Sequence, residues 1–249
     1  MKELTWVHWD IEDSTGILTL ANPPENYLLK PEFVALDRLR VFVEENQLKS
    51  LIIKGTGRHF SGGAKLEELF VMCGSEESME FQLGKGKDLL DYIENLDIPV
   101  VAAISGICFG GGLEIALACH IRFCSENALF AFPETNHGLI PGLGGTVRLG
   151  RKIPMPDSLK MILGGDMINA EEALAMNITD RIIREEDLLS YTLRFLTKIT
   201  HDRQLNVIRA VMRVLNNART MEPAEAMQEE TRMFISLSRT EAERRKSEK

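Results

Sequence analysis

Two carboxylates in this sequence stand where a side chain could exchange protons with a bound molecule. Glu114 is the only charged residue between Asp97 and His120, and Glu134 ends an apolar segment that glycine-rich turns follow. Because burial disfavours the charged form of a carboxyl group, an apolar setting raises its pKa toward the range useful for general acid–base catalysis. Two such groups facing one pocket could hold a water molecule and move a proton. The alternative for Glu114 is a simple ion pair with a buried cation.

Exposed backbone N–H groups are the second chemical feature that the sequence predicts. Glycines 110–112 open an apolar helix, and their missing side chains would let a substrate lie against bare N–H donors. In residues 59–66 a strand leads into a glycine turn, and we expect a helix to begin near Ala64, where the first N–H groups lack an intrahelical partner. Such groups can donate to a developing oxyanion, although a plain tight turn would explain the same glycines. Nine of the 19 glycines lie between Gly106 and Gly150, which indicates close approach of the backbone to another group.

The hydrophobic pattern predicts an α/β core that positions these groups. The first 20 residues alternate between apolar and polar positions and predict a β-hairpin. Strand–helix alternation comes first and helices come last, which predicts a core with a helical C-terminal extension. We expect further strands at 51–53, 99–105, 120–125 and 128–132 and helices at 31–46 (with Pro31 in its first turn), 79–96, 156–163, 170–177, 186–199, 204–218 and 223–246.

The composition is that of a globular protein, and its net charge argues against some classes of binding partner. The chain has 249 residues and a formal net charge of −8, which argues against broad electrostatic binding to nucleic acid or to an anionic membrane. Its four cysteines have no CxxC or metal-ligand spacing, so we expect buried, reduced thiols. The N-terminus lacks the apolar segment of a secretory signal, and no apolar run approaches the roughly 20 residues of a membrane helix. We therefore expect a cytoplasmic protein.

Four motifs, in their order and spacing, resemble those of the enoyl-CoA hydratase/isomerase (crotonase) superfamily. They are FSGGA at 60–64, FGGGLE at 109–114, PE at 133–134 and GLIPGLGGTVRL at 138–149. The resemblance implies an α/β fold in which residues 1–197 form a spiral of ββα units and residues 198–249 form a helical region used for trimer contacts. It implies a homotrimer or a dimer of trimers.

The resemblance also implies a ligand and a site. The ligand would be an acyl-CoA or an acyl group on phosphopantetheine, with no metal or further cofactor. The N–H groups of Ala64 and Gly111 would form an oxyanion hole for the thioester oxygen. Glu114 and Glu134 would be the catalytic residues that position water, and the N–H of Gly142 would face that water. The other substrate-binding residues expected are Gly63, Lys65, Leu66, Gly110, Pro133 and His137.

Three residues depart from the family pattern. Lys65 and His120 stand where the family commonly has Asp, and His137 stands where it has an apolar or small residue. We expect a surface ion pair for Lys65, with the CoA phosphates as the alternative. For His120 we expect a structural interaction near the start of a strand. His137 would be a packed histidine bonded to backbone, or alternatively would line the acyl pocket or take part in proton transfer.

The pair of glutamates favours one reaction within the superfamily. An enoyl-CoA hydratase, a lyase of fatty acid metabolism that also catalyses the reverse dehydration, would need both Glu114 and Glu134. A Δ3-Δ2-enoyl-CoA isomerase would need one glutamate at position 134. A specialised dehydratase acting on a carrier-bound or cyclic acyl thioester remains an alternative, as does a non-catalytic scaffold that binds acyl thioesters or RNA.

Overall fold

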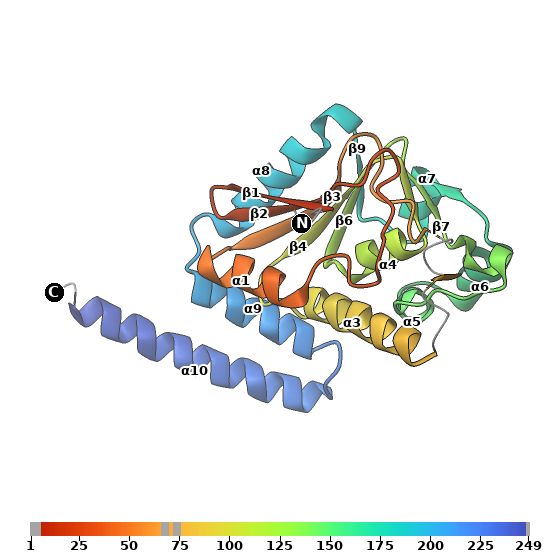
Figure 1. Ribbon diagram of the computed structural model, residues 1–249. Coiled ribbons are helices and arrows are strands. Elements are labelled where there is room, and N and C mark those ends of the chain that lie inside the picture. The colour runs from red at the N-terminus through yellow and green to blue at the C-terminus, as the bar shows by residue number, and fades with distance from the viewer. Residues whose placement is uncertain (1–5, 66–69, 72–75, 248–249) are drawn as a thin grey trace.

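The computed structural model describes residues 6–65, 70–71 and 76–247, whose strands form two sheets (Figure 1). The larger has the order β1-β2-β3-β4-β6-β9 and the smaller β5-β7-β8. The strands are β1 Val7–Glu12, β2 Thr15–Leu20, β3 Ser50–Gly55, β4 Val100–Ile104, β5 Ile107–Phe109, β6 Ile121–Ser125, β7 Leu129–Ala131, β8 Ile168–Asn169 and β9 Arg181–Ile183. The helices are α1 Leu36–Glu45, α3 Glu76–Glu94, α4 Gly111–Ala118, η1 Pro133–His137, α5 Gly145–Lys152, α6 Met155–Gly164, α7 Ala170–Ala175, η2 Glu185–Asp187, α8 Leu188–Thr200, α9 Leu205–Asn217 and α10 Pro223–Ser247.

From β4 to β7 successive strands alternate between the two sheets, which winds the chain into a spiral. β4 lies in the large sheet, β5 in the small one, and α4 follows; β6 and β7 repeat the step, and η1 follows. From β2 to β9 the large-sheet neighbours are parallel, whereas β1 and β2 form the expected antiparallel hairpin. In both of these repeats the short strand of the small sheet therefore leads directly into a helix, α4 or η1.

Both faces of the large sheet are covered at its central strand β3, which explains the uninterrupted apolar run of that strand. Leu51 and Ile53 pack in a large core under α1, α3 and α4, whereas Ile52 between them packs against α8 through Leu188 and Leu196. A strand buried on both faces has a continuous apolar run in place of an alternating pattern. The spiral predicted from the motifs and the strands predicted from these runs are confirmed.

The predicted helix at 31–46 is wrong at its beginning. The helix α1 begins only at Leu36, whose N–H donates to the Glu32 carboxylate, Oε1, at 3.1 Å. Pro31 packs against α3, because a Cβ built on Gly86 would lie 2.8 Å from its Cβ. The residues before α1 thus remain an irregular segment over α3, and this segment contributes to a cavity wall.

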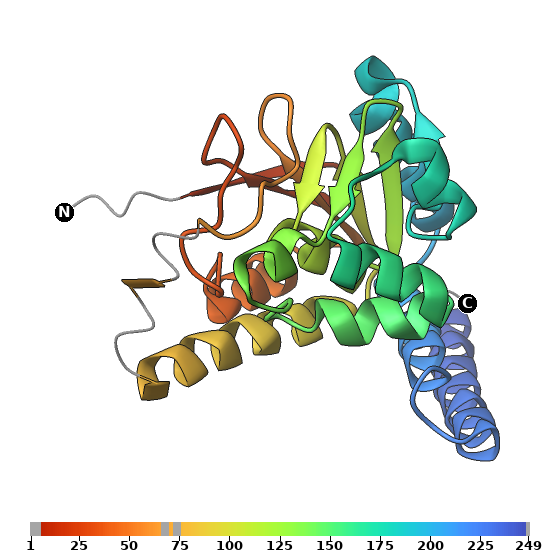
Figure 2. The ribbon, with the colours of Figure 1, turned by 90° about the vertical axis from the view of Figure 1, so that its right-hand side faces the viewer.

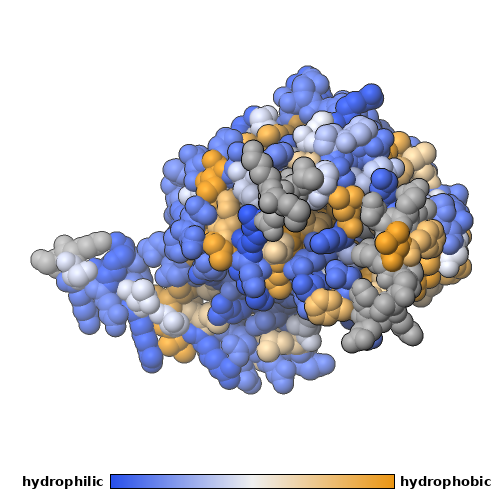
Figure 3. All heavy atoms as spheres, viewed as in Figure 1, coloured by the Kyte–Doolittle hydropathy of each residue, from blue (hydrophilic) through white to orange (hydrophobic). Residues whose placement is uncertain are grey.

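The C-terminal helices lie within two residues of their predicted bounds. Helix α8 runs through residue 200 and covers the sheet, so the boundary at 197, which stays a prediction, falls inside it. Helices α9 and α10 lie side by side, and α10 extends away from the body (Figures 1 and 2). Hydrophobic side chains appear among hydrophilic ones where these helices run (Figure 3). On α10 they include Met227, which is 60% exposed, and Phe234, which is 71% exposed.

Candidate active site

A cavity of about 730 Å³ lies where successive turns of the spiral meet. Its walls come from the irregular segment before α1, the glycine turn at 62–65, α3, the start of α4, η1 and the loop between η1 and α5. Most of its lining is apolar, contributed by side chains that include Leu83, Leu139 and Leu143. A concave, apolar space with a few converging polar groups is the usual setting of a small-molecule site.

Two backbone amides converge on one wall of this cavity. A Cβ built on Gly63 would lie 3.1 Å from the Gly111 nitrogen, and one built on Gly111 would lie 3.8 Å from the Ala64 nitrogen. Gly63 has φ +83°, and its missing side chain allows this approach. Within the part of the chain that the structure describes, neither the Ala64 nor the Gly111 N–H has a protein acceptor. Both face the cavity as unused donors.

The reason that Ala64 is available differs from the sequence-based one. We expected a helix to begin near Ala64, but the residue forms an isolated parallel bridge with Leu28. In that bridge the Leu28 N–H donates to the Gly63 carbonyl at 2.8 Å. Pairing with the irregular segment before α1 therefore fixes this amide, and residues 66–69, into which the predicted helix would continue, lie outside the described residues. Gly111 is the first residue of α4, so its N–H lacks an intrahelical partner as predicted.

Glu114 lies in the first turn of α4 and is anchored by backbone amides. The carboxylate is 2% exposed, and its Oε1 accepts the N–H of Leu143 at 2.6 Å and that of Gly145 at 2.7 Å. Burial raises the pKa of Glu114, and these two N–H donors, which stabilise the ionised form, oppose the rise. Gly145 also begins α5, whose N-terminal dipole favours a carboxylate.

Glu134 faces the same cavity without such an anchor. It lies in η1, and its Oε2 is buried with no hydrogen-bond partner among the described residues. Its Oε1 lies over the start of α4, because a Cβ built on Gly110 would be 2.7 Å away. Burial raises the pKa of Glu134 to about 7; its own backbone N–H opposes this rise and the negative charge of Glu114 adds to it. This carboxyl group therefore changes its protonation state most readily near neutral pH.

The structure brings most of the predicted site residues into one place. Five of them line the cavity together with the two glutamates and the two amides: Lys65, Gly110, Pro133, His137 and Gly142. Gly63 lies behind this wall, where it lets the two amides approach. Leu66 lies outside the described residues. Among the described residues Lys65 makes no ion pair, so the expected surface pair stays a prediction.

Sequence reasoning missed two sets of residues around the cavity. The amides of Leu143 and Gly145 hold Glu114, and the glycine pair before the helical pattern of α5 was an available signal for a helix N-terminus. The second set is the irregular segment before α1, which lines the cavity with residues 27–31. No signal marked it, because the segment gains its place only by packing on α3 and on the glycine turn.

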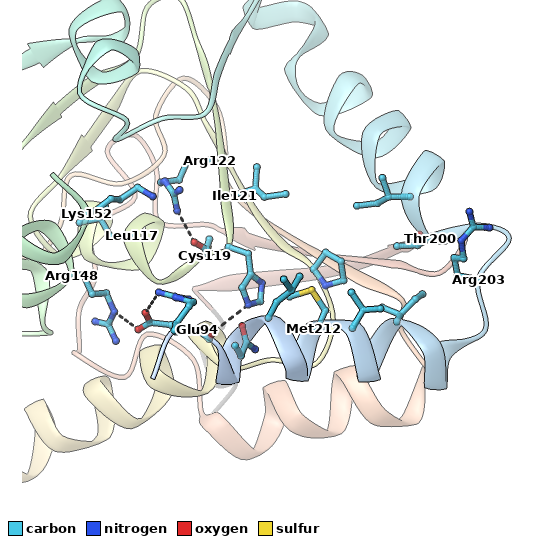
Figure 4. A pocket seen from close by; sticks show the side chains of 18 of the residues that line it. Glu94, Leu117, Cys119, Ile121, Arg122, Arg148, Lys152, Thr200, Arg203 and Met212 are labelled. Carbon is cyan, nitrogen blue, oxygen red and sulfur yellow. Dashed lines mark hydrogen bonds and ion pairs between the residues drawn. The ribbon is translucent and has the colours of Figure 1, made fainter. Parts of the chain in front are cut away.

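A second cavity, of about 880 Å³, lies between α9 and the core (Figure 4). Its buried or half-buried charged groups, Arg122 and Glu94 among them, have protein partners, whereas Arg151 and Lys152 on its wall are exposed. Arg122, which is 2% exposed, donates to the carbonyls of Ile178 and Cys119 and to the Asp180 carboxylate. Glu94 accepts from both Arg148 and Arg219. This cavity is larger than the first, but its buried polar groups have protein partners.

His120 belongs to this second cavity and has a structural place. Its Nδ1 accepts the Val100 N–H at 3.0 Å, so its Nε2, 3.2 Å from the Glu94 carbonyl, carries the proton of the neutral ring. Burial lowers the pKa of His120 to about 4. Cys108, Cys119 and Cys124 are buried free thiols as expected, and Cys73 lies outside the described residues.

The described residues contain neither a cluster suited to a metal ion nor a membrane-spanning helix. Between residues 6 and 247, outside the gaps at 66–69 and 72–75, no group of three or more His, Cys, Asp or Glu side chains is placed to hold a metal ion. Over the same residues, no helix is long and apolar enough to cross a membrane.

The sequence and the fold of this chain are similar to those of known proteins. A family model described as enoyl-CoA hydratase/isomerase matches residues 10–248. A probable enoyl-CoA hydratase of Bacillus subtilis (strain 168) is 37% identical over 180 residues, 71% of this chain and 68% of that protein. The fatty acid oxidation complex subunit alpha of Shewanella loihica (strain ATCC BAA-1088 / PV-4) is 41% identical over 141 residues, which are 56% of this chain and 20% of that longer protein. The crystal structure of an enoyl-CoA hydratase from Polaromonas sp. JS666 has a TM-score of 0.85 at 26% identity, covering 92% of this chain and 90% of that one.

Proposed function

Because the chain belongs to the enoyl-CoA hydratase/isomerase family, we propose that it is an enoyl-CoA hydratase, a hydro-lyase that reversibly adds water to a trans-2-enoyl thioester. One observation carries this proposal. The buried carboxylate of Glu114 and the half-buried one of Glu134 share a cavity with the amides of Ala64 and Gly111, two donors unused among the described residues. The amides suit the oxygen of a thioester and the carboxylates suit a water molecule.

The amides would supply the electrophilic part of the reaction. When the N–H groups of Ala64 and Gly111 bind the thioester carbonyl, they draw electron density from the conjugated double bond and make C3 electrophilic. The negative charge of the enolate then develops on the oxygen at which both donors already point. Preorganised donors of this kind are worth about 10²–10³ in rate for each donor. The dipole of α4 behind Gly111 acts in the same direction.

The carboxylates would divide the handling of water. Glu114, held as a carboxylate by two N–H groups, would orient the water through its remaining acceptor capacity, assisted by the N–H of Gly142. Glu134, whose pKa is raised to about 7 and whose Oε2 is unpartnered, would take a proton from that water and pass it to C2. The water oxygen bonds to C3 as a hydroxyl group. One hydroxyl and one proton are thus added, and both carboxyl groups return to their initial states.

A direct assay tests this proposal. Purified protein mixed with a short trans-2-enoyl-CoA should remove the absorbance of the conjugated thioester. No hydration, together with movement of a β,γ double bond into conjugation, would replace the hydratase by an isomerase. Turnover of a carrier-bound or cyclic thioester alone would indicate a specialised dehydratase. An RNA complex without thioester turnover would indicate a scaffold. Thioesters of graded length and branching would define the acyl group.

Assembly and requirements follow from the same proposal. We propose that α9 and α10 make the contacts of a homotrimer or a dimer of trimers; the exposed apolar side chains of α10, Met227 and Phe234 among them, support this. Light scattering would test it, and a strict monomer would contradict it. We expect turnover without added metal or redox cofactor, which enzyme dialysed against a chelator would test. A cytoplasmic location, suggested by the composition, would be tested by cell fractionation.

A further inference from the structure

The Glu114 carboxylate is held by a glycine-rich turn. The two N–H groups that bind Oε1 belong to Leu143 and Gly145, within the segment 142–145. Three of its four residues are glycine, and Gly144 has φ +96°. Glycine gives a chain the widest conformational freedom, so such a turn needs support from outside to keep two amides aimed at one oxygen.

Arg148 provides that support from α5. Its Nη1 donates to the Leu143 carbonyl at 2.7 Å, between the two amides that hold Glu114. Its other donors reach α3: Nε bonds Glu94 at 2.7 Å and Nη2 bonds Asp91 at 2.6 Å. The Arg148 side chain is 9% exposed, and of its two carboxylate partners Glu94 is the more buried and Asp91 the more exposed. A Cβ at position 144 would lie 2.7 Å from Nη1, and the glycine there thus makes room for the guanidinium.

We propose that Arg148 is a positioning residue for Glu114: by clamping the 142–145 turn to α3, it fixes the amides that hold the Glu114 carboxylate toward the cavity. The inference rests on the proposed function, because it assigns Arg148 a part in the same reaction. Its planar fork makes three bonds in fixed directions, which a lysine ammonium cannot reproduce.

The guanidinium also acts on Glu114 through charge. The positive charges of Arg148 on α5 and Lys87 on α3 lower the pKa of Glu114 against the effect of burial. Glu134 in η1 is the carboxylate that faces it across the cavity. Loss of Arg148 would therefore loosen the turn and raise the pKa of Glu114 further, whereas lysine at 148 would keep the charge and lose the geometry.

Three variants separate these effects: R148M, R148K and, as a matched control, R151M. Arg151 lies three residues further along α5, is exposed and forms no ion pair among the described residues. Steady-state hydration of a short trans-2-enoyl-CoA and its pH profile are measured for each variant. We expect R148M to lower kcat about 10–100-fold with KM changed less than about twofold, and to raise the pKa of Glu114, which ¹³C NMR follows. R148K should lower kcat and leave the pKa of Glu114 near its wild-type value. R151M should match the wild type.

The outcomes distinguish this inference from the proposed function. Wild-type kcat in folded R148M, or an equal loss in R151M, would overturn the role of Arg148 and leave the hydratase proposal intact. If R148M does not fold, the same measurements are made on R148K and on D91N. The D91N substitution replaces one carboxylate partner of the guanidinium. Absence of hydration by the wild type would overturn the proposed function alone. In that case titration of Glu114 by ¹³C NMR decides, because an unchanged Glu114 pKa in R148M would refute the clamp without any turnover.

Discussion

The two cavities differ in how completely their polar groups are bonded. The second cavity is the larger one and holds more charge, yet Arg122, Glu94 and His120 in it all have protein partners. In the first cavity the Ala64 and Gly111 amides have none among the described residues, and neither does Oε2 of Glu134. Protein interiors normally satisfy buried polar groups, so unsatisfied ones carry a cost in stability.

This difference in hydrogen bonding indicates that the first cavity, and not the second, is the one suited to catalysis. In the second cavity the hydrogen-bonded polar groups connect elements of the fold. Arg122, for example, connects β6 to the segment before β9 through Ile178 and Asp180. In the first cavity the polar groups without a protein partner can still form hydrogen bonds with a ligand. Neither volume nor the number of charges separates the two cavities in this way.

The largest effect is expected from removing the titratable group of the first cavity. E134Q keeps the size of the side chain and removes its ability to carry a proton. We expect kcat for hydration to fall about 10²–10⁴-fold, measured by the loss of enoyl-thioester absorbance. E126Q, the same change at an exposed glutamate outside both cavities, should leave kcat unchanged. Wild-type activity in E134Q would contradict the inference that the unbonded polar groups of the first cavity carry out catalysis.

A smaller loss is expected when the carboxylate is displaced without being removed. In G110A the new Cβ would meet Oε1 of Glu134 at 2.7 Å, and the residue has φ +49°. Gly57 has φ +66° and open space around it, so G57A carries the backbone strain without the contact. We expect both variants to lose roughly 1 kcal/mol of stability and G110A alone to lose activity, by about 10–100-fold. Equal activities in the two variants would argue against the position of Glu134 as a determinant of rate.

The third effect concerns stability and pH. The folded-state pKa of Glu134, about 7, lies above its ordinary value of 4.5. The folded state therefore holds this proton more tightly, and the stability that the protonated group contributes is lost as pH rises through about 7. From about pH 5.5 to about pH 8.5 we expect the wild type to lose roughly 1–3 kcal/mol relative to E134Q in chemical denaturation. A constant difference across this range would show that Glu134 titrates in the folded protein as it does in the unfolded chain.

The smallest effect is expected in the second cavity. H120A removes the acceptor of the Val100 N–H and the donor to Glu94, and should cost about 1–2 kcal/mol with kcat unchanged. Because the pKa of His120 is lowered to about 4, its contribution is present above pH 6.5 and is lost as pH falls toward 4. Denaturation curves of H120A and of H8A, at an exposed histidine on β1, would measure it. A large fall in kcat in H120A would show that His120 contributes to catalysis.

Much of this molecule could be predicted from local patterns. The strand Leu51–Ile53 is apolar at every position because α8 and the α1–α3–α4 layer cover both faces, and such runs are visible in any sequence. The motifs around Glu114 and Glu134 indicated a common pocket. The segment before α1 could not be predicted, since Pro31 suits a first helical turn locally but packs on Gly86 of α3 instead. Availability of the Ala64 amide likewise depends on its bridge with Leu28, a contact between distant residues.

The sequence by itself determined the residue types of the site, its glycines and the order of strands and helices, because these depend on side-chain chemistry and on local hydrophobic periodicity. Only the tertiary structure decided that Glu114 is anchored and Glu134 is not, although both are glutamates in apolar segments. That distinction arises from amides 29 and 31 residues further along the chain and from an arginine that clamps them. A carboxyl group's protonation depends on the donors and charges within a few ångströms, and folding alone brings those together.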